Sequence, residues 1–110
     1  MKREHLAITT TTGLIFIKRS AVLYCCSDGA YTNIYVQGGR KLTVSKNLKE
    51  VEAALATDLF IRIHNSHLIN LDHAVGYINN NYNCVKMSNG EELAVSRNRK
   101  KELMECFVKI

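Results

Sequence analysis

Turn-forming residues divide this chain into short stretches, and that division limits the fold more than any other feature of the sequence. Apolar or alternating stretches of four to eight residues flank these turns, as strands flank hairpin turns. The turn signals are residues 11–13, 27–29, the pair Gly38-Gly39, residues 79–81 and the pair Asn89-Gly90. Because no apolar run is long enough to cross a bilayer as a helix, this pattern favours a globular β-rich protein.

The predicted fold class is mainly β, with about ten short strands in several small antiparallel sheets. Alternation is clearest in residues 30–37, where Thr32, Ile34 and Val36 share one face of the expected strand. The chain has 110 residues, no proline and no linker or charge run, so it is expected to form a single domain over residues 1–110. The expected strands are residues 7–10, 14–17, 22–26, 30–37, 40–44, 60–63, 75–78, 84–87 and 92–95.

Two segments have helical rather than strand periodicity. Residues 47–56 space Leu48, Val51 and Leu55 along one helical face, and Asn47 with Glu50 matches a capping box. Residues 97–108 place Leu103, Cys106 and Phe107 on one face, with Ser96 as the expected N-cap. We therefore expect a helix near 47–56 and a short C-terminal helix.

Charge favours a polyanionic partner. The formal net charge is +5, from 15 Lys and Arg against 10 Asp and Glu. Many basic domains bind nothing anionic, so the clustering of the cations matters more than their total. One cluster comprises Arg97, Arg99, Lys100 and Lys101, and the other comprises Arg40, Lys41, Lys46 and Lys49.

Two strand-to-helix junctions resemble each other, at Ser45-Lys46-Asn47 and at Ser96-Arg97-Asn98. Helix capping alone recruits Ser and Asn to such junctions. A cation in the first turn of a helix, however, opposes the helix dipole at a cost of ~0.3–1 kcal/mol. That cost is explained if Lys46 and Arg97 face phosphates or base edges.

The stretch 60–70 is unusually rich in polar side chains for a strand. Arg62, His64, Asn65 and His67 alternate there with branched apolar residues. Asn and Arg can hydrogen-bond base edges or phosphates. Buried polar groups can equally satisfy one another and hold neighbouring loops, which is the alternative for Arg62 and His64. Asn65 falls near the expected end of the strand, where we expect a binding role.

The sequence gives little support for catalysis or metal binding. The sequence has no phosphate-cradling glycine loop, no H-E-x-x-H motif and no recognisable nucleophile with an oriented base. The four cysteines, Cys25, Cys26, Cys84 and Cys106, form no C-x-x-C pair and do not have zinc-ligand spacing. We therefore expect no enzymatic activity, no cofactor, no metal and mostly buried free thiols in a cytoplasmic protein.

A second mode of nucleic-acid binding remains open. Tyr31, Asn33 and Tyr35 share one face of their expected strand. Aromatic side chains on a basic sheet can stack single-stranded bases, as RNA-binding domains do. They can also cover a half-buried sheet face. RNA or single-stranded nucleic acid is therefore the alternative partner.

The chain resembles the LytTR domain, the DNA-binding output module of many bacterial response regulators. Four segments carry the resemblance in order and together extend it over about residues 6–107. They are Val22-Leu-Tyr-Cys-Cys-Ser-Asp-Gly-Ala-Tyr-Thr, Asn47-Leu-Lys-Glu-Val-Glu, Phe60-x-Arg-x-His-Asn-Ser-His-Leu-Ile-Asn and Leu93-x-Val-Ser-Arg.

The resemblance implies sequence-specific binding of duplex promoter DNA in bacterial transcription regulation. Loops and strand ends would enter the major grooves of tandem sites. The implied DNA-contacting residues are Ala30, Tyr31, Asn65 and Arg97, with Arg99 and Lys100 as phosphate partners. Arg62 and His64 match positions with a structural role. The resemblance also implies a two-component system, with a receiver domain outside this chain, and allows a dimer on DNA; no membrane partner is expected.

Overall fold

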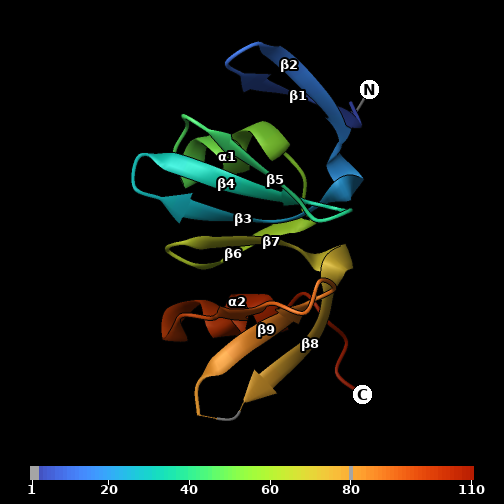
Figure 1. Cartoon of the computed structure of the whole chain (residues 1–110). Helices are drawn as coiled ribbons and strands as arrows, with labels where there is room; N and C mark the ends of the chain where they lie inside the picture. Colours follow the sequence, from blue (N-terminus) through green and yellow to red (C-terminus); the bar gives the residue numbers. More distant parts are fainter. Residues whose placement is uncertain (1–2, 80) are drawn as a thin grey trace.

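The computed structural model describes residues 3–79 and 81–110, which form ten strands in three antiparallel sheets (Figure 1). The strands are β1 (His5–Thr10), β2 (Gly13–Lys18), β3 (Val22–Asp28), β4 (Tyr31–Val36), β5 (Arg40–Val44), β6 (Phe60–His64), β7 (His67–Asn70), β8 (Ala74–Asn79), β9 (Asn83–Met87) and β10 (Glu92–Ala94). The α-helices are α1 (Leu48–Leu55) and α2 (Lys100–Met104). The predicted mainly-β fold is confirmed.

The sheets are small and follow one another along the chain. A hairpin of β1 and β2 comes first, then a five-stranded sheet in the order β5-β4-β3-β7-β6, then a three-stranded sheet in the order β10-β9-β8. In Figure 1 they are stacked from the N-terminal hairpin at the top to β8 and β9 at the bottom. No described helix has the length and apolar character needed to span a membrane.

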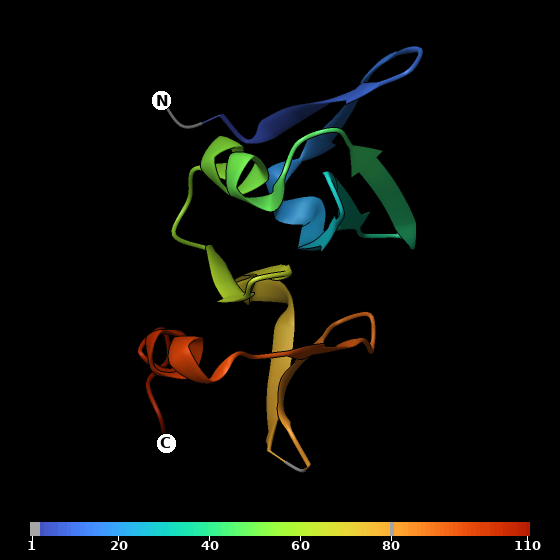
Figure 2. The same cartoon turned by 90° about the vertical axis from the view of Figure 1, so that its left-hand side faces the viewer.

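The five-stranded sheet is buried on both faces. One hydrophobic cluster lies between it and the layer of α1 and the β1–β2 hairpin, and a second lies between it and the layer of α2 and β8–β10 (Figure 2). The neighbours Leu68 and Ile69 on β7 are both 0% exposed and belong to opposite clusters. Burial on both faces explains why residues 22–26 form an apolar run rather than a clean alternation.

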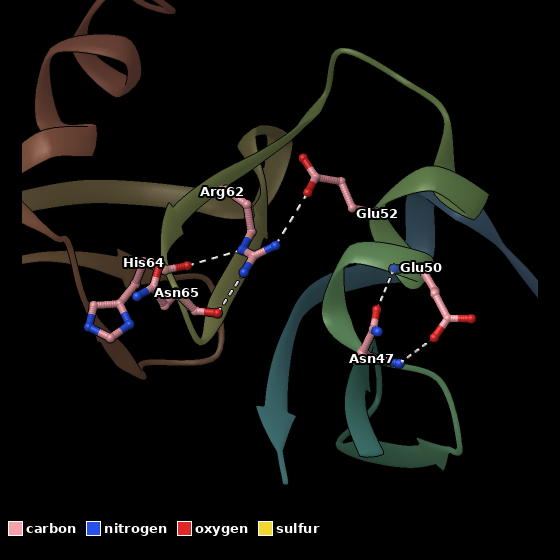
Figure 3. Close-up of polar contacts among 6 residues, drawn as sticks. All are labelled: Asn47, Glu50, Glu52, Arg62, His64 and Asn65. Carbon is pink, nitrogen blue, oxygen red and sulfur yellow. Dashed lines mark hydrogen bonds and ion pairs between the residues drawn. The ribbon is translucent and has the colours of Figure 1, made fainter. Parts of the chain in front are cut away.

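The helix α1 begins with the capping box that the sequence predicts. The Glu50 backbone N–H donates to Asn47 Oδ1 at 2.8 Å, and the Asn47 backbone N–H donates to Glu50 Oε1 at 3.1 Å (Figure 3). Leu48, Val51 and Leu55 are buried against the sheet. The helix therefore has a defined start and a defined buried face.

Asn47→Ala is expected to lower the free energy of unfolding by ~1 kcal/mol, because it removes the acceptor of the Glu50 N–H. Urea denaturation measures this loss. Asn98→Ala is the matched control: Asn98 occupies the corresponding place in the second junction, is exposed and caps no helix. Equal losses in the two variants would contradict the capping role.

The C-terminal segment differs from the prediction of a helix over 97–108 capped by Ser96. Residues Arg97–Arg99 form a 3₁₀ helix, η3, and α2 ends at Met104. The Ser96 side chain caps nothing; its Oγ lies 3.4 Å from the carbonyl oxygen of Ile63, which also accepts from the Ser96 N–H at 2.8 Å. A tertiary contact with β6 thus replaces the expected cap, and consecutive cations oppose the dipole of the first turn.

The prediction that Cys106 and Phe107 share a buried face with Leu103 is also wrong. Leu103 is 1% exposed, whereas Phe107 is 50% exposed and Cys106 is exposed. The helix α2 ends at Met104, before Cys106 and Phe107. These two residues therefore lack the helical backbone that would place their side chains on the same face as Leu103.

The Gly38-Gly39 turn is one residue longer than predicted. Val36 pairs with Arg40, so residues 37–39 form the connection, and both glycines have positive φ, 88° and 80°. Residues with a side chain rarely adopt that backbone conformation, which explains why both positions are glycine. In the expected turn at 79–81, Asn80 lies outside the described residues.

Candidate nucleic-acid interface

Three connecting segments lie together at one edge of the five-stranded sheet: the β3–β4 turn, the β6–β7 turn and the start of η3 (Figure 1). The Ser27 N–H donates to the Ser66 carbonyl at 3.0 Å, which joins the first two. The Ser96 N–H donates to the Ile63 carbonyl, which joins the third to the end of β6. Antiparallel pairing of β3 with β7 places their loops side by side because Cys26 lies opposite His67.

The β6–β7 turn is held by Arg62. Its Nε donates to the His64 carbonyl at 3.1 Å, and its Nη2 donates to the Asn65 carbonyl at 2.6 Å (Figure 3). Its Nη1 forms an ion pair with Glu52 on α1 at 3.5 Å. All three guanidinium nitrogens are thereby engaged, so Arg62 acts as a structural brace of the turn.

The Asn65 side chain is left available by this arrangement. It is exposed at the tip of the turn, and its amide group makes no hydrogen bond with the part of the chain that the structure describes. A fixed backbone with a free amide is the geometry that a base-contacting or phosphate-contacting residue requires.

A histidine pair lies behind the turn. The His64 Nδ1 accepts from the Ser66 N–H at 3.1 Å, and the His67 Nδ1 donates to the Ala94 carbonyl at 3.1 Å. The two rings lie 4.9 Å apart. Burial lowers the pKa of His67, and the neighbouring His64 lowers it further, against the raising effect of the Ala94 carbonyl. The pair connects β7 to the strand that leads into η3.

Acidification is expected to destabilise the fold through His67. Its folded-state pKa is lower than its ordinary value of 6.5, so between the two values the unfolded chain binds more protons. This contribution to stability is fully present above about pH 6.5 and decreases as the pH falls through that window. Urea denaturation at several pH values measures it.

His67→Gln, which keeps a hydrogen-bonding side chain, should reduce the loss of stability on acidification. His5→Gln changes an exposed histidine in the same way and should leave the pH dependence as in the unsubstituted chain. Curves of stability against pH that run parallel in all three proteins would rule out His67 as the source.

Arg97 lies exposed at the first position of η3. The double contact of Ser96 with Ile63 fixes the backbone immediately before it. Arg99 is half-buried, and its N–H donates to the Ser96 carbonyl at 3.0 Å. The Lys100 ammonium lies 5.7 Å from the centre of the Tyr77 ring. The edge thus brings the start of η3, with Arg97, beside the β6–β7 turn, whereas the Lys100 side chain is engaged with Tyr77.

Ala30 and Tyr31 occupy the β3–β4 turn at the same edge. Both are exposed, with Tyr31 at 52%, and the turn depends on Gly29 at φ 60°.

The rest of the strand face predicted to stack single-stranded bases is already occupied by contacts within the chain. Tyr35 stacks on Tyr24 at 4.6 Å, and Asn33 accepts from Thr43 at 2.7 Å. Single-stranded bases would find one open aromatic ring there, so the alternative partner has no support.

The second basic cluster is divided by the fold. Thr32 Oγ1 donates to the Lys46 carbonyl at 2.7 Å, which holds exposed Lys46 at the loop-bearing edge. Arg40 pairs with Val36 at the opposite end of β4 and β5. Spacing in the sequence does not reveal this difference; the strand register does, because antiparallel strands carry their two ends to opposite edges.

The cysteines do not contribute to a metal site in the described part of the chain. No group of three or more His, Cys, Asp or Glu residues that could hold a metal ion occurs among the described residues. All four cysteines are free: Cys25 and Cys84 are buried, Cys26 is half-buried and Cys106 is exposed. Burial raises the pKa of the Cys26 thiol to about 11, so it is protonated and a poor nucleophile at neutral pH.

Known proteins share both the sequence pattern and the fold. The model of the LytTr DNA-binding domain family matches residues 12–107. Sensory transduction protein LytT of Bacillus subtilis (strain 168) is 27% identical over 108 residues; the match covers 96% of this chain and 44% of LytT. The solved LytTr DNA-binding domain of a putative methyl-accepting/DNA response regulator from Bacillus cereus superposes with a TM-score of 0.80 at 25% identity, covering 94% of this chain and 96% of that one. Because the family model matches most of the length of this chain, the chain belongs to the LytTr DNA-binding domain family.

Proposed function

We propose that the chain binds duplex DNA sequence-specifically through the edge formed by the β3–β4 turn, the β6–β7 turn and η3. DNA binding in transcription regulation follows from the family. The specific assignment depends on one observation: three segments distant in sequence converge there and present exposed side chains above a braced backbone. The base-contacting side chains would be Asn65 and Arg97, with Ala30 and Tyr31 beside them.

The chemistry of these side chains suits the major groove. An arginine can donate two hydrogen bonds to guanine O6 and N7, and an asparagine can pair with adenine N6 and N7. Lys46 and Arg99 would neutralise phosphates at the same edge, whereas Lys100 would first have to leave Tyr77. The longest dimension of the molecule, 44 Å, exceeds the ~34 Å of one DNA turn, so the molecule is long enough to span adjacent major grooves.

The regulatory setting is also a proposal. The chain spans less than half the length of LytT, a sensory transduction protein. We infer that it works with a receiver domain outside this chain, in a two-component system. Two copies of the chain on tandem sites would then form the functional complex on a promoter.

Selection of bound sequences from a random duplex pool tests the proposal. We expect a defined sequence to emerge, and its affinity to fall log-linearly with salt as phosphate counterions are released. Asn65→Ala should weaken binding of that sequence by about fivefold or more, at ~1–3 kcal/mol per lost base contact. Asn81→Ala, which changes an exposed asparagine between β8 and β9, is the matched control and should bind normally.

Two results would contradict the assignment. Tighter binding of single-stranded RNA than of any duplex would favour the stacking mode. Equal affinities of the Asn65 and Asn81 variants for the selected duplex would remove the β6–β7 turn from the interface.

A further inference from the structure

A cavity of about 360 Å³ lies between the β1–β2 hairpin, α1 and the five-stranded sheet. The hairpin and α1 cover the same face of the sheet in Figure 1. Its size falls at the lower end of the range of small-molecule sites, ~300–1,000 Å³. Its walls are largely apolar and include Leu6, Ile8, Val22, Ile34, Val51 and Leu55.

The charged groups of this cavity are basic. The cations Arg3, Arg19 and Lys46 line it together with the polar residues His5, Thr9 and Ser45, and none of the described residues that line it is acidic. An apolar interior with several basic groups and no acidic one at its polar positions is complementary to a molecule with one anionic end and an apolar tail. Small-molecule sites show this combination of apolar walls and a few placed polar groups.

Arg19 is the best-positioned of these cations. Its side chain is 13% exposed, and its Nη1 donates to the Arg3 carbonyl and lies 3.6 Å from Glu4 Oε1. Its Nε is buried and has no acceptor among the described residues. Buried donors are nearly always paired, since an unpaired one costs ~1–3 kcal/mol. The exposed Glu4 carboxylate leaves most of the guanidinium's hydrogen-bonding capacity unused.

We propose that this cavity binds a small monocarboxylate with an apolar tail, of the size of a medium-chain fatty acid. The tail lies among the apolar walls under α1, and the carboxylate pairs with Arg19 and the neighbouring cations. Neither of the proposed base-contacting residues, Asn65 and Arg97, lines the site, although Lys46, a proposed phosphate partner, does.

Titration of the isotope-labelled chain with decanoate, below its micelle concentration, tests the proposal by NMR. Saturable shifts are expected for backbone amides of the hairpin and α1. Decanol has the same tail without the charge and should bind at least tenfold more weakly. Ala54→Phe places a ring into the cavity from an exposed position of α1 and should weaken decanoate binding at least tenfold.

Ala53→Phe is the matched control, because Ala53 is exposed on the same helix and does not line the cavity. It should bind decanoate as the unsubstituted chain does. Absence of saturation, equal affinity for decanol, or unchanged binding by the Ala54 variant would each overturn the proposal. So would shifts confined to Met104 and Phe107, which line a different cavity beside α2.

Discussion

Arg97→Ala is expected to weaken binding of the selected duplex by about 5- to 150-fold, equivalent to ~1–3 kcal/mol. Arg97 is exposed, and the Ser96 contacts with Ile63 hold its backbone at the loop-bearing edge. In the proposed interface, loss of the guanidinium removes a bidentate donor from one base pair, so discrimination at that pair should be lost as well. Fluorescence anisotropy with the selected duplex and its single-base variants measures both effects.

Two further variants separate charge from geometry. Arg97→Lys keeps the charge but not the planar fork, so it should retain the salt dependence of binding and lose the discrimination. Arg40→Ala removes an exposed arginine from the opposite end of β5 and should change affinity little. If Arg97→Ala bound the selected duplex as tightly as the unsubstituted chain, the assignment of η3 to the interface would be wrong.

Leu68→Ala is expected to lower the free energy of unfolding by ~2–5 kcal/mol. Leu68 is 0% exposed on β7, an interior strand of the five-stranded sheet, and its side chain packs in the cluster beneath α1. Truncation leaves a cavity that strands paired on both sides cannot close easily. Chemical denaturation followed by circular dichroism measures the loss.

The same variant tests whether the two hydrophobic clusters unfold together. Ile69 packs in the second cluster, one residue away, so disruption of β7 should destabilise both sides of the sheet in one transition. Leu14→Ala makes the same chemical change at a 58% exposed position and should change stability by no more than ~0.5 kcal/mol. Separate transitions for the two halves of the chain would contradict a shared core.

Local patterns were sufficient to predict most of the fold. Alternation and turn residues predicted the strands, because period-two burial and positive-φ turns are properties of a few neighbouring residues. The capping box at Asn47 is similarly local, and the structure contains it. The strand β7 was not among the predicted strands, because burial on both faces leaves no alternation to recognise.

The candidate site was predictable in its residue types but not in its assembly. Asn65 and Arg97 were singled out from polar density and cation placement, and the structure brings their segments together. The role of Ser96, the position of Lys100 over Tyr77 and the separation of Arg40 from Lys46 were not predictable. Each depends on pairing between segments far apart in sequence, which no local pattern records.

The brace at the β6–β7 turn has a consequence for how binding specificity can change over time. Arg62 holds the turn through main-chain oxygens of His64 and Asn65, which every amino acid supplies. The side chain at position 65 can therefore be exchanged while the loop keeps its shape. If Asn65 contacts bases as proposed, new operator preferences become accessible through single substitutions that leave folding intact, and a duplicated copy of such a gene can diverge toward new promoters without first acquiring compensating stability.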